Sequence, residues 1–210
     1  MTSASTQRIA LRDGLHASGL ALAPGIQEKL IAYIELLAKW NRAYNLTAVR
    51  DPEQMIARHL LDSLAILPLV RGPRVLDIGS GAGLPGIPLA LARPEISFVL
   101  LDSNAKKTRF ITQAVAELGL ENVEAVQERA EKYLPVAKFD TLIARAFAGI
   151  ADMLAVSAPL VAPGGRWLAM KGVYPQEELS AIPPGYTIET QQLQVPGLDA
   201  ARHVVIITPQ

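Results

Sequence analysis

The residues from 77 to 86 form the pattern with the clearest chemistry in the chain. They read Asp77-Ile-Gly79-Ser-Gly81-Ala-Gly83-Leu-Pro-Gly86 and follow a predicted strand. Glycine lets the backbone turn tightly and approach a ligand without a Cβ atom in the way, and the helix predicted to follow would offer unpaired N–H groups. Asp102 ends the next predicted strand, about 20 residues further on, where a carboxylate can bind both ribose hydroxyls. The pattern therefore indicates a nucleotide-like cofactor.

Two cofactors fit this loop, and a glycine turn that binds nothing is a third possibility. The run from Gly81 to Gly86 matches the G-x-G-x-x-G pattern of dinucleotide sites, whereas residues 77–83 match the D-x-G-x-G-x-G pattern of S-adenosylmethionine methyltransferases. An acid among the glycines suits a methionine ammonium group and would repel a pyrophosphate. Pro85 also removes an N–H that a pyrophosphate would use. The sequence therefore favours S-adenosylmethionine, with Asp77, Gly79, Gly81 and Gly83 as part of its site.

The composition excludes several other chemistries. The chain of 210 residues contains no cysteine, which excludes disulfides, thiolate zinc sites, Fe–S clusters and attack on pyrimidine C5 through a thioether adduct. His59 and His203 have no partner ligands at metal spacing, so no metal site is expected. Twenty basic and 20 acidic residues give a net charge of zero, which argues against indiscriminate nucleic-acid binding but allows a local basic site.

The elements that must position the loop change character near residue 70. Before it, apolar residues recur at helical spacing, which predicts one helix over 24–43 and another over 52–67. Asp51 is expected to cap the second helix, with Pro52 at its first position, and residues 44–51 are expected to connect the two. We therefore expect an N-terminal helical extension, residues 1–70, and a second unit, residues 71–210, within one compact molecule.

After residue 71, short apolar strands alternate with helices. Strands are predicted over 74–79, 96–102, 122–127, 139–145 and 166–171, with helices over 85–93, 104–119 and 148–162. This alternation is typical of βαβ crossovers and of a parallel sheet with helices on both faces. Two further runs, 185–194 and 202–208, are expected to form an antiparallel hairpin at one edge. The predicted fold is α/β: a Rossmann-like, mostly parallel sheet of seven strands, as in class I methyltransferases.

Seven stretches of the chain together point to one family. They are Tyr44–Thr47, Arg58–Ser63, Asp77–Pro88, Leu101–Ser103, Ile143–Phe147, Lys171–Gly172 and Arg202–Val204. With these residues the sequence resembles the bacterial 16S ribosomal RNA guanine-N7 methyltransferase G family, also called glucose-inhibited division protein B. The resemblance covers nearly the whole chain from about residue 41 onward, whereas residues 1–25 match poorly. It implies an enzyme that uses S-adenosylmethionine to methylate N7 of one guanine in the decoding-region loop of 16S ribosomal RNA, with that RNA or the small subunit as partner.

The resemblance also implies which residues hold the cofactor. By it, cofactor contacts fall at Gly79, Leu84, Asp102, Ala130, Glu131 and Arg145. Several of these lie at or just past the carboxyl ends of predicted strands, where open α/β sheets bind ligands. The alternative for Glu131 is a solvated carboxylate at a helix start. The alternative for Arg145 is a structural salt bridge to Asp77 or Asp102.

The tip of the fourth predicted strand narrows the reaction. Residues 144–147 read Ala-Arg-Ala-Phe, in place of the Asn/Asp-Pro-Pro-aromatic motif used to methylate exocyclic amines. Guanine N7 needs no such device, because it presents an in-plane lone pair and loses no proton on methylation. We therefore nominate no general base and expect Arg145 near the reaction mouth, with catalysis by alignment of the acceptor in a dry pocket.

Basic residues near the expected site are candidates for RNA contacts. They are Lys171 at the end of the fifth strand, Lys106, Lys107 and Arg109 after Asp102, and Arg58 and His59 in the helical extension. For most of them the alternative is an ordinary solvated charge. Two other functions stay open at this point: a small-molecule methyltransferase, which would have a closed pocket, and a non-catalytic cofactor-binding regulator, which would show no turnover with RNA.

The sequence also carries expectations about where the protein acts. Residues 1–6 have no basic segment followed by an apolar run, as a signal peptide would. The least charged stretch, residues 146–165, is interrupted by Pro159, Pro163 and Gly164–Gly165, so we expect a buried helix and no membrane span. We expect a cytoplasmic monomer with no membrane partner.

Overall fold

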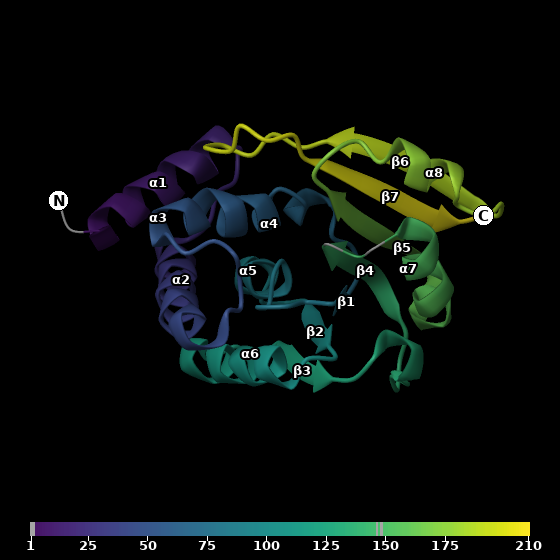
Figure 1. The fold of residues 1–210 in the computed structure, drawn as a ribbon, viewed down its shortest axis with the longest axis horizontal. Helices are drawn as coiled ribbons and strands as arrows, with labels where there is room; N and C mark the ends of the chain where they lie inside the picture. The colour runs from purple at the N-terminus through teal and green to yellow at the C-terminus, as the bar shows by residue number, and fades with distance from the viewer. Residues whose placement is uncertain (1–2, 146, 148) are drawn as a thin grey trace.

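The computed structural model describes residues 3–145, 147 and 149–210, and its centre is a seven-stranded sheet (Figure 1). The strands are β1 (Arg74–Ile78), β2 (Ser97–Asp102), β3 (Val123–Gln127), β4 (Phe139–Arg145), β5 (Val161–Lys171), β6 (Tyr186–Gln192) and β7 (His203–Pro209). Their order is β3-β2-β1-β4-β5-β7-β6, in which β1 to β5 are parallel and β7 is antiparallel to both β5 and β6. The predicted Rossmann-like fold and its C-terminal hairpin are confirmed.

Helices cover both faces of this sheet. They are α1 (Ser3–Ala17), α2 (Pro24–Tyr44), α3 (Pro52–Met55), α4 (Asp62–Leu64), α5 (Gly86–Ala92), α6 (Ala105–Leu118), α7 (Ile150–Ser157) and α8 (Gln176–Ser180), with short turns η3 (Ala130–Lys132) and η4 (Ala158–Leu160). The helix predicted over 24–43 is α2, whereas α1 was not predicted. None of the described helices is long and apolar enough to cross a membrane.

The second predicted helix begins as expected but changes its pitch. Pro52 is its first residue, and the Asp51 carboxylate accepts a hydrogen bond of 2.9 Å from the Glu53 N–H. After α3 the chain continues in π-helical turns, η1 (Ile56–Leu61), before α4 and a final turn, η2 (Leu67–Leu69). Such wide turns often occur at functional sites. This one supplies one partner of Arg145, the Arg58 carbonyl, and the other, Asp62, begins α4 directly after it.

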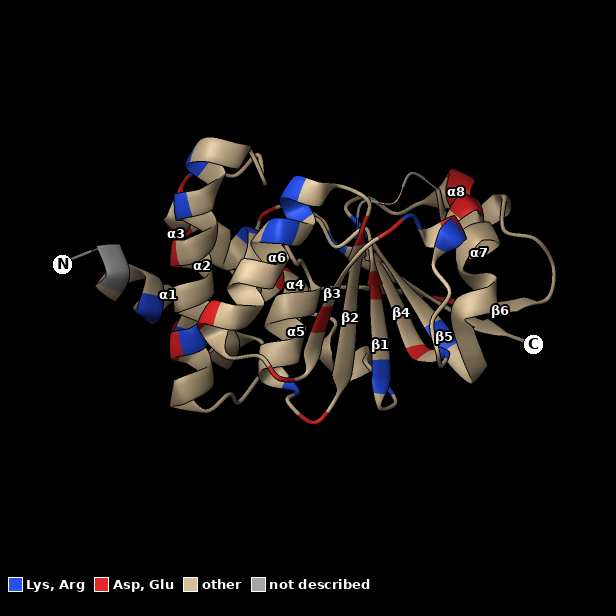
Figure 2. Cartoon of the chain, turned by 90° about the horizontal axis from the view of Figure 1, so that it is seen from below, with Lys and Arg blue, Asp and Glu red and all other residues tan. Residues whose placement is uncertain are grey.

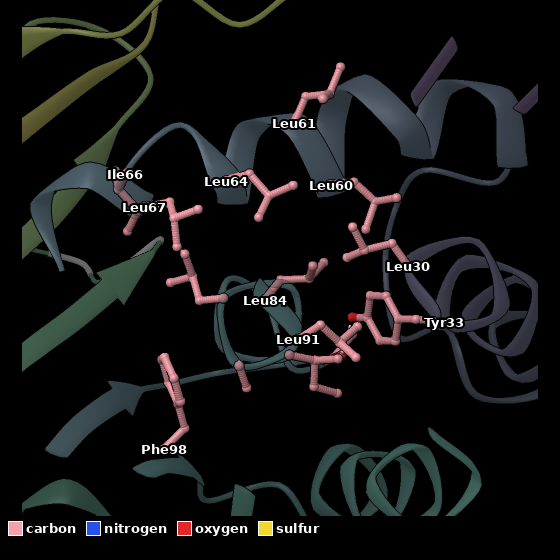
Figure 3. Close-up of a cluster of buried hydrophobic side chains, with 14 of the residues drawn as sticks. Leu30, Tyr33, Leu60, Leu61, Leu64, Ile66, Leu67, Leu84, Leu91 and Phe98 are labelled. Atoms are coloured by element: carbon pink, nitrogen blue, oxygen red, sulfur yellow. Dashed lines mark hydrogen bonds between the residues drawn. The ribbon is translucent and has the colours of Figure 1, made fainter. Parts of the chain in front are cut away.

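The N-terminal helices share one hydrophobic core with the sheet. Leu30 and Tyr33 of α2 lie near Leu60 and Leu64 of the η1–α4 segment, and all of them pack toward α5 (Figure 3). Side chains along a strand point alternately to opposite faces. The same cluster therefore includes Val75 of β1 and its neighbours on that face, whereas the alternate residues of the strands form a second cluster with α7.

The segment before β5 differs from the prediction. A helix was expected over 148–162, but α7 ends at Ser157 and the chain is already extended from Val161 (residue 148 lies outside the described residues). Phe139 pairs with Val161 while Thr141 pairs with Arg166, so residues 162–165 bulge out of the ladder. This stretch reads Ala-Pro-Gly-Gly, and proline and glycine in strands commonly mark bulges because proline cannot donate to the ladder.

Candidate functional site

The glycine loop begins at the carboxyl end of β1 and is tied to β2. The N–H groups of Gly79 and Ser80 both donate to the Leu101 carbonyl, at 2.8 and 3.1 Å. Gly79 has φ +68°, and a Cβ atom at this position would meet no atom within 4 Å. The loop therefore presents bare backbone to open space at the strand end, where a ligand can approach closely.

Asp77 lies beneath this loop and not on its open face. Its side chain is fully buried, and Oδ2 accepts a hydrogen bond of 2.8 Å from the Gly86 N–H at the start of α5. A Cβ atom on Gly86 would come within 2.8 Å of the same oxygen, so only glycine permits this contact. Burial raises the pKa of Asp77 to about 7. Asp77 thus ties the loop to α5, a role that the sequence did not predict, and its predicted pairing with a cofactor ammonium stays a prediction.

The later part of the loop is also packed inward. A Cβ atom on Gly83 would lie 2.5 Å from Ile87 Cδ1, so this glycine allows the loop to pack closely on α5. Leu84 is buried in the same core as α5. Neither residue lines the pocket described below, and their predicted cofactor contacts stay predictions.

Asp102 stands at the end of β2 with both carboxylate oxygens fixed by the backbone. Oδ2 accepts from the Gly81 N–H at 2.9 Å, and Oδ1 accepts from the Asn104 N–H at 2.8 Å. Lys107 Nζ lies 4.0 Å from Oδ2. A carboxylate has about four acceptor positions. Asp102 therefore keeps lone pairs for two further donors, which suits the two hydroxyls of a ribose.

These residues meet in what we call the strand-end pocket, a cavity of about 360 Å³ at the carboxyl ends of β1 and β2. It is lined by Ile78, Gly79, Leu101, Asp102, Ser103, Lys107, Glu128, Arg129, Ala130, Glu131 and Phe147. Four of the predicted cofactor residues, from three separate segments, are thus brought together. A larger groove of about 1020 Å³ lies between α1, α3 and residues 196–200, but no residue of the glycine loop lines it.

Arg145, at the tip of β4, is bound to the helical extension. Its Nη2 lies 3.1 Å from Asp62 Oδ2 and donates to the Arg58 carbonyl at 2.9 Å. The alternative that we considered for Arg145 was a structural salt bridge to Asp77 or Asp102. The structure shows a salt bridge, but its partner is Asp62. Arg145 Nη1 is buried and has no hydrogen-bond partner among the described residues. It is a spare donor at the strand tip.

His59 is not on the surface, so its predicted RNA contact is wrong. The residue is 4% exposed, its Nδ1 lies 3.0 Å from the Arg58 carbonyl, and its Nε2 lies 2.9 Å from Thr47 Oγ1. Since a carbonyl only accepts, we assign the proton to Nδ1. Burial lowers the pKa of His59 to about 4, so the ring is neutral at pH 7. Its role is to join the 44–51 connection to η1.

Lys171 is likewise engaged inside the protein. Its Nζ lies 2.6 Å from Glu178 Oε2 and donates to the Phe147 carbonyl at 3.3 Å. The same Glu178 oxygen accepts from the Ile150 N–H at 3.0 Å. Lys171 thus holds Phe147 near Glu178 of α8, and its predicted contact with RNA stays a prediction.

The other predicted RNA residues keep accessible side chains. Lys106 and Arg109 are exposed and Lys107 is partly exposed, all at the start of α6, beside the carboxyl ends of the strands (Figure 2). The Asn104 side chain caps this helix by accepting from the Lys106 and Lys107 N–H groups. Arg58 is also exposed. These four remain candidates for a basic rim, and their contacts with RNA stay predictions.

Three residues at this site were missed. Tyr33 Oη donates to the Ala82 carbonyl of the glycine loop at 2.6 Å, although its spacing indicated only a core position on α2. Asp62 binds both Arg145 and Arg202, the latter through Nε at 2.8 Å. Asp62 and Arg202 belong to two of the stretches that carried the family resemblance, Arg58–Ser63 and Arg202–Val204. That resemblance was the signal by which they could have been found.

The sheet order, the glycine loop after β1 and the carboxylate that ends β2 together define a class I methyltransferase fold. Solved structures agree. The O-methyltransferase TomG from Streptomyces achromogenes superposes with a TM-score of 0.61 at 17% identity, covering 100% of both chains. A SAM-dependent methyltransferase from Aquifex aeolicus gives 0.59 at 20% identity, over 81% of this chain and 97% of that one. At such identities the likeness concerns the fold.

Closer relatives identify the family. The model of the rRNA small subunit methyltransferase G family matches residues 26–205. The ribosomal RNA small subunit methyltransferase G of Laribacter hongkongensis is 53% identical over 196 residues, 93% of this chain and 95% of the relative. That of Nitrosococcus oceani is 52% identical over 201 residues, 95% and 94%. The chain belongs to the rRNA small subunit methyltransferase G family, as the sequence predicted, and it is a methyltransferase.

Proposed function

We propose that this protein transfers the methyl group of S-adenosylmethionine to N7 of one guanine in the decoding-region loop of 16S ribosomal RNA. The observation that carries the proposal is the match, over nearly the full length, to relatives that are named rRNA small subunit methyltransferase G. The choice of guanine N7 rests on the family resemblance. The missing cysteine and the Ala-Arg-Ala-Phe sequence at the tip of β4 support it, since both argue against a carbon or an exocyclic amine as the acceptor.

In this proposal the strand-end pocket holds the cofactor. Gly79 leaves open space for it, Asp102 offers its free lone pairs to the ribose hydroxyls, and Ala130 and Glu131 lie at the adenine edge. Arg145 contributes its unpartnered Nη1 as a donor for the methionine carboxylate. These features fit S-adenosylmethionine, which supplies an electrophilic methyl group on a sulfonium when it is bound.

The proposed reaction requires little acid–base catalysis by the protein. The guanine N7 lone pair forms the new N–C bond as the C–S bond breaks, and the electron pair of that bond stays on sulfur. The base gains a positive charge and no proton is lost, so no general base is needed. The residues of the pocket therefore act by binding, alignment and exclusion of water.

The RNA would approach at the carboxyl ends of the strands. Lys106, Lys107, Arg109 and Arg58 supply accessible positive charge there, which supports an RNA acceptor over a small molecule. The net charge of zero implies that this attraction is local and that the shape of the target contributes much of the recognition. The proposal places the protein in the cytoplasm, where ribosomal RNA is transcribed and assembled, and has it act as a monomer.

Mapping of N7-methylguanosine in 16S RNA tests the proposal. This nucleoside becomes a strand-scission site after treatment with borohydride and aniline. We expect one scission site in cells that contain the protein, its loss in a deletion strain and its return on complementation. Scission that persists in the deletion strain would refute the substrate, even if S-adenosylmethionine binding were confirmed by calorimetry.

A pair of glycine variants makes this test specific to the pocket. Gly79→Asp should not restore scission, because it places a side chain and a negative charge where the cofactor is proposed to bind. Gly119→Asp is the matched control: Gly119 has φ +60° and equally open surroundings, but it lies at the end of α6 away from the pocket. Gly119→Asp should restore scission fully.

A further inference from the structure

Two stretches that carried the family resemblance lie outside the strand-end pocket, and the structure brings them together. Asp62, from Arg58–Ser63, is 1% exposed and bonds Arg202, from Arg202–Val204, through Oδ1 at 2.8 Å. Its Oδ2 pairs with Arg145 at 3.1 Å. One buried carboxylate thus holds two guanidinium groups, and the cluster keeps a net charge of +1. Arg202 is also 3.7 Å from where a Cβ atom of Gly172 would lie, so the loop after β5 borders the same cluster.

This cluster adjoins the cofactor side of the molecule. Phe147, which lines the strand-end pocket, is held through its carbonyl by Lys171 at the end of β5. In the antiparallel register of β5 and β7, Lys171 lies opposite His203, the residue that follows Arg202. The loop that connects β5 to α8, residues 172–175, therefore begins beside Arg202 and follows directly on Lys171, which holds a residue that lines the pocket.

That loop exposes apolar surface at this position. Tyr174 is 50% exposed and Val173 is 79% exposed. The Tyr174 ring meets the His203 ring nearly at a right angle, 83°, with 5.7 Å between the ring centroids. The ring is therefore held against His203 and is still half exposed. A supported, half-exposed aromatic ring beside a cationic group is the arrangement by which proteins stack unpaired RNA bases and hold the adjoining phosphate.

We propose that Tyr174 and Arg202 form the site for the RNA strand that carries the target guanine. Tyr174 stacks on an unpaired base, and the Arg202 guanidinium, oriented by Asp62, lies against the backbone phosphate. Asp62 is the positioning residue for Arg202 and touches no RNA itself. This inference rests on the proposed function and adds the residues that read the acceptor.

The test uses small ribosomal subunits from the deletion strain and radiolabelled S-adenosylmethionine. Tyr174→Ala should raise KM for the subunit about tenfold, the effect of losing one stacked base, while Tyr174→Phe should retain the wild-type KM. The dissociation constant for S-adenosylmethionine should not change in either variant. Ile188→Ala is the matched control, because it removes a comparably exposed apolar side chain further along the hairpin, on β6. An unchanged KM for Tyr174→Ala would overturn the inference.

A second measurement tests the positioning role of Asp62. Asp62→Asn keeps the size of the side chain and loses its charge, so Arg202 should move and KM for the subunit should rise about as much as in Arg202→Ala. If Asp62 served stability alone, KM for the folded fraction would stay at the wild-type value. That outcome would remove Asp62 from the inference.

The chemical identity of the partner is tested by photocrosslinking. A photoreactive phenylalanine in place of Tyr174 should form an adduct with 16S RNA close to the methylated guanine. An adduct with a ribosomal protein alone, or no adduct, would contradict the stacking role. If the wild-type protein transfers no methyl group to the subunits, the proposed function itself fails and this inference falls with it. Transfer with a normal KM in Tyr174→Ala refutes the inference alone.

Discussion

At the scale of single residues, the site depends on three buried carboxylates, two of which bind more than one partner. Asp102 fixes two backbone N–H groups and keeps lone pairs for a ligand, and Asp62 orients two arginines at once. Asp77 is committed to the loop, because burial leaves it only the Gly86 N–H as a partner among the described residues. Three aspartates near one site therefore have different roles, and the groups that surround each side chain determine its role.

Replacing Asp102 should weaken the cofactor site. In Asp102→Ala we expect the binding of S-adenosylmethionine to lose about 1.5–3 kcal/mol, the value of hydrogen bonds to a charged group. Calorimetric titration measures it. Asp140→Ala is the control, because Asp140 also accepts a backbone N–H, that of Arg74 at 3.0 Å, but at the opposite end of the strands. Equal affinities for the wild-type protein and Asp102→Ala would contradict the assignment.

His59 should make stability depend on pH. Its pKa is about 4 in the folded protein because the ring is buried, whereas an unfolded histidine titrates near 6.5. The unfolded chain therefore binds more protons between these values, and the free energy of unfolding falls as pH drops from about 6.5 to 4, by up to about 3 kcal/mol.

Asp77 acts in the opposite direction over the whole of this range. Its pKa of about 7 in the folded protein lies above that of an unfolded carboxyl, so its contribution to stability increases as pH falls below 7. Urea unfolding at pH 7 and pH 5 should therefore be compared between the wild-type protein and His59→Gln. Relative to its value at pH 7, the free energy of unfolding at pH 5 should be higher in His59→Gln than in the wild-type protein, because only the wild type carries the unfavourable histidine contribution. The same change between pH 7 and pH 5 in both proteins would show that His59 does not contribute.

At the scale of elements, the helical extension is part of the site. Tyr33 on α2 holds the Ala82 carbonyl of the glycine loop at 2.6 Å, and the η1–α4 segment supplies the partners of Arg145. Elements from before residue 70 thus hold the loop after β1 and the tip of β4. This explains how a short loop with several left-handed glycines keeps one conformation.

Removing one oxygen from α2 should loosen the loop. Tyr33→Phe leaves the aromatic packing in place but deprives a buried carbonyl of its partner, which costs about 1–2 kcal/mol of unfolding free energy. We also expect weaker binding of S-adenosylmethionine, because Ala82 lies inside the loop. Chemical denaturation and calorimetry measure the two effects. Tyr44→Phe, at an exposed tyrosine of the same helix, should change neither; a Tyr33→Phe protein with wild-type stability would refute the role of this bond.

At the scale of the whole molecule, one apolar cluster joins residues from Leu11 to Ile206. Leu30, Leu60 and Leu91, which lie together in Figure 3, come from the extension and from the methyltransferase part alike. The change near residue 70 that the sequence shows is therefore a change in secondary-structure pattern. The residues before and after it contribute to the same hydrophobic core.

Deletion of residues 1–70 should abolish folding of the remainder. The shortened chain 71–210 would expose the apolar faces of α5 and α6 that the N-terminal helices cover. We expect it to be insoluble or to lack a cooperative thermal transition, measured by circular dichroism. A soluble fragment with a sharp transition would establish residues 71–210 as an independent domain.

Local pattern by itself determined the element types and the fold class. Alternation of apolar strands with helices predicts βαβ units, and the glycines after Asp77 predict a nucleotide loop, because both signals come from residues adjacent in sequence. The strand-end pocket followed as well, since parallel strands bring their carboxyl ends to one edge. The helix cap at Asp51 could be predicted for the same reason, because it involves neighbouring residues only. The boundary between helix and strand near residue 160 could not be predicted, because it depends on the pairing of β5 with β4.

Only the tertiary structure decided which charges are free and which are committed. Arg202 and Asp62 are 140 residues apart in sequence yet form a 2.8 Å ion pair, and no local pattern could join them. For the same reason Lys171 and His59, which in the sequence resemble available cations, are paired or buried in the fold. The partner of a polar side chain depends on which distant elements pack beside it. The sequence therefore determined the fold, the family and the cofactor loop, and the packing of helices on the sheet determined how the acceptor side of the site is built.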